Sequence, residues 1–172
     1  MDEYATLERD EIMSDRSAVT LWIYEIPERK AEDVLEVIED YGFTQDWFGS
    51  DPFTVEALLE GVDNQETFFI EEASLGTALE VSQRLEDLDV AHRAHQDPKY
   101  EWSGDLRMFH PKIGSWQGQA DADGNAIVPD HQIRYYMKRS VNPVTLLDRI
   151  KEAVGITYED RFRPLVGLPP LT

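Results

Sequence analysis

Acidic side chains at helical spacing carry the strongest chemical signal in this sequence. Six carboxylates lie between positions 28 and 40: Glu28, Glu32, Asp33, Glu36, Glu39 and Asp40. On a helix, residues four apart are separated by about 6 Å along the axis, which is close to the spacing of phosphates along a nucleic-acid strand. Such a row can serve as a binding surface for a protein that normally binds nucleic acid. The alternative is a solvated helix face, which is the usual role of charged positions on a surface helix.

The charge of the chain is distributed unevenly along the sequence. Residues 1–90 contain 25 Asp and Glu against five Arg and Lys, whereas residues 91–172 contain ten against eleven. The net charge of −19 repels nucleic acid and anionic membranes. We therefore expect a protein partner that is basic or binds nucleic acid, and no direct nucleic-acid or membrane binding. Salt adaptation or simple solubility is the alternative, although salt adaptation should spread the acids over both halves.

An aromatic loop follows the acidic segment. Trp47, Phe48 and Phe53 lie close together in a loop that contains Gly49 and Pro52. Exposed aromatic residues anchor protein interfaces, so we expect Trp47 and Phe48 to join the acidic row in binding. The alternative is a loop that folds over the end of a sheet.

Two further patterns resemble metal sites without completing one. The run Asp121–Asn125 begins like a calcium loop, but Gln132 stands where that loop requires a bidentate Glu. A zinc site would have to gather distant residues, namely His92, His95 and His110 with Glu101 or Asp105. Because His92 and His95 face opposite sides of the strand expected there, we expect no metal site. The sequence contains no phosphate loop, Gly-x-Ser-x-Gly elbow or Gly-x-Gly-x-x-Gly fingerprint, so we expect no cofactor and no catalytic residue.

The composition excludes cysteine chemistry, a membrane span and a secretory signal. Cysteine is absent, which excludes disulfides, thiolate catalysis and cysteine-based zinc sites. No stretch has the ~20 apolar residues that a membrane span requires. The acidic N-terminus also lacks the apolar region of a secretory signal. We therefore expect a cytoplasmic protein.

Hydrophobic periodicity predicts the elements that position the acidic row. Residues 18–26 have apolar side chains on both faces, which predicts a strand covered on both sides. A helix follows and ends before Gly42, with one apolar stripe made of Ala31, Val34, Leu35, Ile38 and Tyr41. Its opposite side carries the acids.

The pattern continues with alternating strands and helices. Residues 54–61 alternate like a half-buried strand, and a second strand is expected at 67–70. A helix at 76–88 and a short strand at 90–95 complete the first half. The order strand, helix, strand, strand, helix, strand predicts a ferredoxin-like core.

The second half extends this core. Sheet is expected at 100–109 and 114–128, with Asp123-Gly124-Asn125 as a hairpin turn. Asp130 can cap one helix, and Asn142 followed by Pro143 predicts the start of another. Four apolar residues of that second helix are expected to face inward: Leu146, Leu147, Ile150 and Val154. The proline-containing tail is expected to be extended and to wrap the body.

The fold class is therefore α+β: a ferredoxin-like βαββαβ core, an antiparallel sheet with helices on one face, extended by a C-terminal hairpin and helix. We expect a single domain over residues 1–172. It comprises an N-terminal arm or frayed helix at 1–16, the acidic unit at 18–96, and the hairpin, helix and tail at 99–172.

The first functional hypothesis is a non-enzymatic interaction protein that presents its acidic surface to a partner. One form of it is a DNA mimic, encoded by a phage or mobile element, that inhibits a nucleic-acid-binding host or defence protein. The alternatives are a small ligand-binding or enzymatic domain of ferredoxin-like type, or a structural component of a phage or plasmid. The sequence also leaves a homodimer open.

Overall fold

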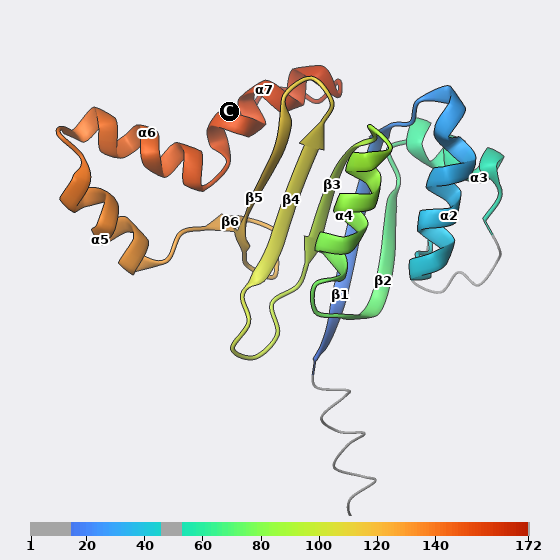
Figure 1. Ribbon diagram of the computed structural model, residues 1–172, viewed down its shortest axis with the longest axis horizontal. Coiled ribbons are helices and arrows are strands. Elements are labelled where there is room, and N and C mark those ends of the chain that lie inside the picture. Colours follow the sequence, from blue (N-terminus) through green and yellow to red (C-terminus); the bar gives the residue numbers. More distant parts are fainter. Residues whose placement is uncertain (1–14, 46–52, 172) are drawn as a thin grey trace, which may run out of the picture.

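The computed structural model describes residues 15–45 and 53–171. Within these residues the chain is α+β, with one antiparallel six-stranded sheet in the order β2-β1-β3-β4-β5-β6 (Figure 1). The strands are β1 (Arg16–Glu25), β2 (Thr67–Ser74), β3 (Ala91–Gln96), β4 (Gly104–His110), β5 (Gly114–Ala120) and β6 (Ala126–Ile127).

Helices occupy most of the remaining described chain. They are the short 3-10 helix η1 (Glu28–Lys30), α2 (Ala31–Tyr41), α3 (Val55–Asp63), α4 (Thr77–Asp87), α5 (Asp130–Arg139), α6 (Pro143–Ala153) and α7 (Ile156–Leu165). None of the described helices is long and apolar enough to cross a membrane.

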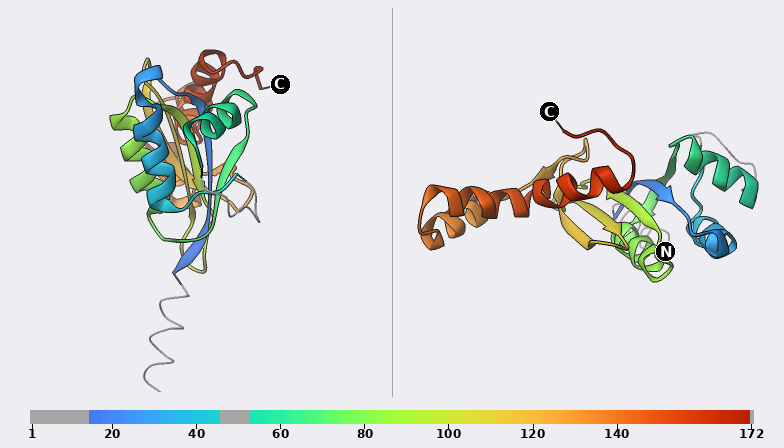
Figure 2. Two further views of the ribbon diagram at one scale, coloured as in Figure 1. Left: turned by 90° about the vertical axis from the view of Figure 1, so that its right-hand side faces the viewer. Right: turned by 90° about the horizontal axis from the view of Figure 1, so that it is seen from above.

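Each face of strand β1 packs into a different hydrophobic core. Val19, Leu21 and Ile23 are buried in the main core with residues of α2, α3 and α4. On the other face, Tyr24 packs edge-on against Phe162 of α7, with 5.3 Å between the ring centroids. The sheet therefore separates α2 and α4 from α7 (Figure 2), and the prediction of a strand covered on both faces is confirmed.

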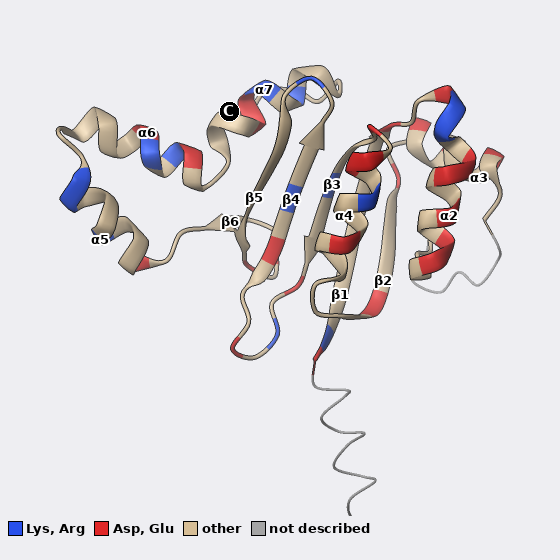
Figure 3. Cartoon of the chain, viewed as in Figure 1, with Lys and Arg blue, Asp and Glu red and all other residues tan. Residues whose placement is uncertain are grey.

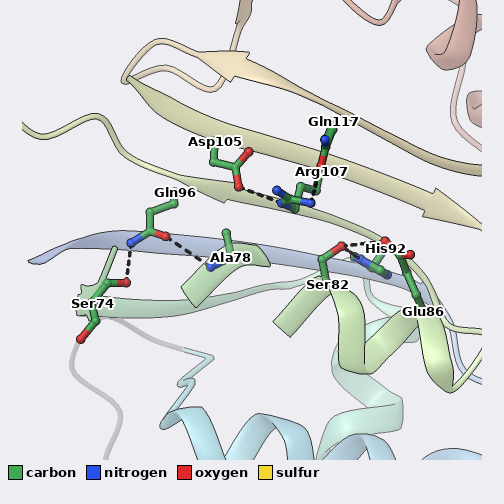
Figure 4. Close-up of polar contacts among 9 residues, drawn as sticks. All are labelled: Ser74, Ala78, Ser82, Glu86, His92, Gln96, Asp105, Arg107 and Gln117. Carbon is green, nitrogen blue, oxygen red and sulfur yellow. Dashed lines mark hydrogen bonds and ion pairs between the residues drawn. The ribbon is translucent and has the colours of Figure 1, made fainter. Parts of the chain in front are cut away.

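A buried polar network fastens α4 to the sheet (Figure 4). The N-cap of α4 is Gly76, which has no side chain to cap the helix. Gln96 of β3 takes that role, because its side-chain oxygen accepts from the backbone N–H of Ala78 at 3.3 Å. Its amide donates to the Ser74 carbonyl at 2.9 Å and to the Ser17 hydroxyl at 3.2 Å. A single buried side chain thus connects α4, β1, β2 and β3.

The ferredoxin-like βαββαβ core is not confirmed, since the sheet has more strands and the predicted strand at 54–61 is helix α3. Thr54 caps α3, its hydroxyl accepting from the N–H of Ala57 at 3.1 Å. Leu58, Gly61 and Val62 are buried at helical spacing. The same residues satisfy an alternating and a helical pattern, and the cap with its buried stripe favours the helix.

Several local predictions in the second half are confirmed. The Asp121 carboxylate accepts from the N–H groups of Asp123 and Asn125 at 3.0 and 2.8 Å, which forms the predicted turn. The Asn142 side chain caps α6 by accepting from Thr145 at 2.9 Å. The predicted capping role of Asp130 is wrong, because Pro129 is the N-cap residue of α5 and Asp130 lies in its first turn.

Two tertiary predictions for the second half are wrong. The tail does not begin extended, because residues 156–165 form α7, which accommodates Pro164 in its last turn. The residues of α6 expected to face inward do not enter a core, since no residue of α5 or α6 is buried in the described structure. These two helices form an arm that projects from the body (Figure 1).

Candidate functional site

The acids of the predicted row share the solvent side of α2. Glu32, Asp33, Glu36, Glu39 and Asp40 are all exposed, and so is Glu28 in η1. The opposite side of α2 is buried in the main core through Ala31, Val34, Val37 and Ile38. The helix is therefore amphipathic as expected, and its carboxylates project away from the fold.

Helix α4 brings a second set of acids beside the first. The two helices form a shallow groove of about 300 Å³, lined by Asp33, Glu36, Val37, Arg84, Asp87 and Leu88. Carboxylates thus stand on both sides of a floor that includes the apolar residues Val37 and Leu88. We call this surface the α2–α4 groove.

Arg84 is the basic residue that lines the α2–α4 groove. Its guanidinium donates to the Asp40 carboxylate at 2.6 Å and lies 5.7 Å from the centre of the Tyr41 ring. The hydrogen bond to Asp40 raises the pKa of Arg84. This pair joins α4 to α2 and neutralises one acid, and Lys30 approaches Asp33 at 3.8 Å. Glu36 and Asp87 have no such basic neighbour among the described residues.

Basic residues of the second half lie elsewhere. Acidic positions colour α2, α3 and α4, whereas most basic positions lie on the arm, on α7 and on the strands (Figure 3). Among the described residues, four of the eleven bases of the second half form ion pairs, and all four pair with acids of the same half: Arg93 and Arg163 with Glu159, Arg107 with Asp105, and Arg134 with Asp130. The fold therefore does not neutralise the α2 acids with the bases of residues 91–172.

The predicted aromatic residues Trp47 and Phe48 lie outside the described residues. Phe53, the third member of that loop, packs against the main core. Its ring centroid is 5.8 Å from that of Phe68. For Phe53, the alternative of a loop residue folded onto the sheet agrees with the structure.

The three histidines that could have gathered around zinc do not come together. His92 is buried under α4, while His95 and His110 belong to the opposite face, as the strand register shows. Among the described residues, no group of three or more His, Cys, Asp or Glu side chains could hold a metal ion.

Ser82 and His92 form a pair that the sequence reasoning missed. The Ser82 Oγ lies 2.7 Å from His92 Nε2, and His92 Nδ1 donates to the Val90 carbonyl at 2.8 Å (Figure 4). This resembles the geometry of a nucleophile and its base. Both side chains are fully buried, so substrate cannot reach them, and the pair serves to fasten α4 to the sheet. The residues are ten positions apart on different elements, so no local motif could have revealed them.

Comparison with known proteins identifies a family whose function is unknown. The model of the DUF3145 family, described as a protein of unknown function, matches residues 62–166. No curated protein and no solved structure matches the chain. The matched segment runs from the end of α3 through α7 and omits β1 and α2. Because β1 lies between β2 and β3, the matched segment alone does not contain the whole sheet.

Proposed function

The chain belongs to the DUF3145 family, and we propose that it is a non-enzymatic interaction protein whose α2–α4 groove binds a basic protein. The observation that carries the proposal is the groove itself. Exposed carboxylates from two adjacent helices border it, and no base of residues 91–172 forms an ion pair with them in the described part of the chain.

The groove suits a basic protein segment for two reasons. Val37 and Leu88 provide an apolar floor, on which the aliphatic stem of a Lys or Arg side chain can lie. Asp33, Glu36 and Asp87 surround that floor and attract the charged head group. Arg84 is already paired with Asp40 at 2.6 Å, so its positive charge is largely balanced and repels a basic partner less.

A DNA mimic is one form of this proposal. The carboxylates along α2 recur at about 6 Å, and the partner in this form is a nucleic-acid-binding protein of a host or defence system. The proposal includes a cytoplasmic location for both proteins and origin in a phage or mobile element. A homodimer is compatible with it, because the acidic groove and the arm are separate surfaces (Figure 1).

Charge reversal in the α2–α4 groove tests the proposal. The triple variant Asp33→Lys, Glu36→Lys and Asp87→Lys changes the three exposed acids that line the groove. The wild-type chain should capture a basic protein from host lysate at low salt and release it at high salt, since exposed charge contacts are screened within ~8 Å at physiological ionic strength. The captured protein is then purified and its affinity for both chains is measured by calorimetry. The triple variant should lose that affinity.

A matched variant controls for net charge. Asp148→Lys, Glu152→Lys and Asp160→Lys alter three exposed acids of α6 and α7 by the same amount. This control should keep the wild-type affinity. An equal loss in both variants would show that overall charge, not the groove, attracts the partner. Recovery of only acidic or neutral proteins would contradict the proposal.

A further inference from the structure

A cavity lies on the opposite face of the sheet from the α2–α4 groove. Its volume is about 440 Å³, which falls within the 300–1,000 Å³ range of small-molecule sites. Arg93, Leu106 and Met108 of β3 and β4 line it from the sheet, and Glu159 and Arg163 of α7 line it from the helix. The β5–β6 turn and the tail residue Leu171 also border it. We call it the Arg93 cavity.

Two arginines and one glutamate make up the charge of this cavity. Arg163 contacts Glu159 at 3.1 Å, and the nearest guanidinium nitrogen of Arg93 is 3.9 Å from the same carboxylate oxygen. One carboxylate between two guanidinium groups leaves an excess of one positive charge. A ligand with a single negative charge would balance it.

Arg93 has hydrogen-bonding capacity that the protein does not use. It donates to the Gly124 carbonyl at 3.0 Å, but its distance to Glu159 exceeds that of a hydrogen bond. Its Nε is buried and has no hydrogen-bond partner among the described residues. The guanidinium lies 5.3 Å from the Trp22 ring, which supports it by a cation–π contact. The Nε is shielded from solvent, whereas Nη1 makes no hydrogen bond among the described residues, so an acceptor in the cavity that reaches Nη1 would be stabilising.

The remaining wall is largely apolar. Leu106 and Met108 are buried on the sheet, and Val154, Ile156 and Leu171 line the cavity from the arm junction and the tail. An inorganic anion would leave this surface without a partner. An organic acid would cover it.

We propose that the Arg93 cavity binds a small organic carboxylate with an apolar chain. Arg163 donates through Nε to the Pro169 carbonyl and through Nη1 to Glu159. Arg93 donates through Nη2 to the Gly124 carbonyl. The ligand carboxylate accepts from the remaining terminal nitrogens, Nη1 of Arg93 and Nη2 of Arg163, in charge-assisted hydrogen bonds. The apolar chain lies over Leu106 and Met108. Glu159 disfavours a doubly charged phosphate at the same place, because it already supplies one negative charge between the arginines.

The Arg93 cavity is independent of the α2–α4 groove. It lies on the other face of the sheet, and its charged residues Arg93, Glu159 and Arg163 are inside the segment that the family model matches. Failure of one proposal therefore leaves the other unchanged.

Binding of octanoate tests the proposal, with octanol as the uncharged probe of the same chain length. Octanoate should bind the full chain saturably in calorimetry, and the side-chain Nε–H resonance of Arg93 should shift in the nitrogen–proton spectrum. Octanol should bind at least about tenfold more weakly, because it lacks the charge-assisted hydrogen bonds.

Two arginine variants and one control locate the binding. Arg93→Gln and Arg163→Gln should each weaken octanoate binding by about tenfold or more, while Arg161→Gln, an exposed residue of the same helix, should leave it unchanged. Circular dichroism verifies that each variant is folded. If Arg93→Gln does not fold, the octanoate affinity of Arg163→Gln tests the proposal. Equal binding of octanol and octanoate, equal loss in all three variants, or no saturable octanoate binding would each overturn the proposal.

Discussion

At the scale of single residues, His92 shows how burial sets the chemistry of a side chain. Burial lowers its pKa from 6.5 to about 4. The unfolded chain therefore binds a proton at higher pH than the folded chain does. The stability that His92 contributes is fully present above pH 6.5 and is lost progressively as the pH falls from 6.5 to about 4. This difference corresponds to about 3 kcal/mol.

Replacement of the Ser82–His92 pair should remove the part of the pH dependence of stability that His92 causes. In the double variant His92→Phe and Ser82→Ala both partners become apolar, so neither is left unpaired. The Val90 carbonyl loses its donor from His92, a cost that is the same at every pH because a carbonyl does not titrate. Urea denaturation at pH 7, 6, 5 and 4 measures the free energy of unfolding. We expect the wild-type chain to lose about 3 kcal/mol more than the double variant over this range.

An exposed histidine provides the control for this measurement. His131 lies on the surface of α5, so His131→Gln should follow the wild-type pH dependence. If the double variant also follows it, the histidine is charged in the folded state and the assigned cause is wrong.

At the scale of elements, the arm of α5 and α6 differs from every helix of the body. Its large apolar residues are open to solvent, with Met137 at 59%, Leu147 at 51% and Val144 at 67% exposed. At its base, the Trp116 ring nitrogen of β5 donates to the Glu152 carbonyl of α6 at 2.9 Å. Gly155 then turns the chain from α6 into α7 with φ 76°, and a Cβ there would lie only 2.9 Å from the Trp116 ring.

The same substitution in the arm and in the core should have very different costs. Leu147→Ala removes a half-exposed side chain and should change the free energy of unfolding by less than about 0.5 kcal/mol. Leu85→Ala removes a fully buried side chain of α4 and should cost about 2–5 kcal/mol. Urea denaturation at low protein concentration measures both. A large cost for Leu147→Ala would show that the arm packs against another surface in solution, such as a second copy of the chain.

At the scale of the whole molecule, the net charge of −19 weakens the compact state through self-repulsion. Added salt screens that repulsion and should raise the melting temperature. A triple variant of α2, Glu32→Lys, Glu36→Lys and Glu39→Lys, should also melt slightly higher than wild type at low salt. Thermal melts at several salt concentrations measure both effects.

The control variant of α6 and α7 separates local from global repulsion. Residues 91–172 are nearly neutral, so reversal of Asp148, Glu152 and Asp160 should raise the melting temperature less than reversal on α2. If the two variants gain equally, repulsion depends on total charge and not on the crowding of acids near α2.

The sequence by itself determined the elements whose signals are local. β1 and α2 follow from periodicity, Gly42 ends α2 with φ 73°, and Asn142 caps α6. The acidic side of α2 follows from the same periodicity. Because the apolar stripe faces the core, the carboxylates between its residues face solvent. Each of these signals acts within a few residues of chain, which is why it can be seen without the fold.

Only the tertiary structure decided what depends on distant residues. The segment 54–61 fits a strand and a helix equally well in pattern, and packing of Leu58 and Val62 in the main core favours the helix. The pairing of Ser82 with His92, the capping of α4 by Gln96, and the meeting of Arg93 with Glu159 all join different elements. These contacts depend on strand order and register, which place residues side by side regardless of their separation along the chain.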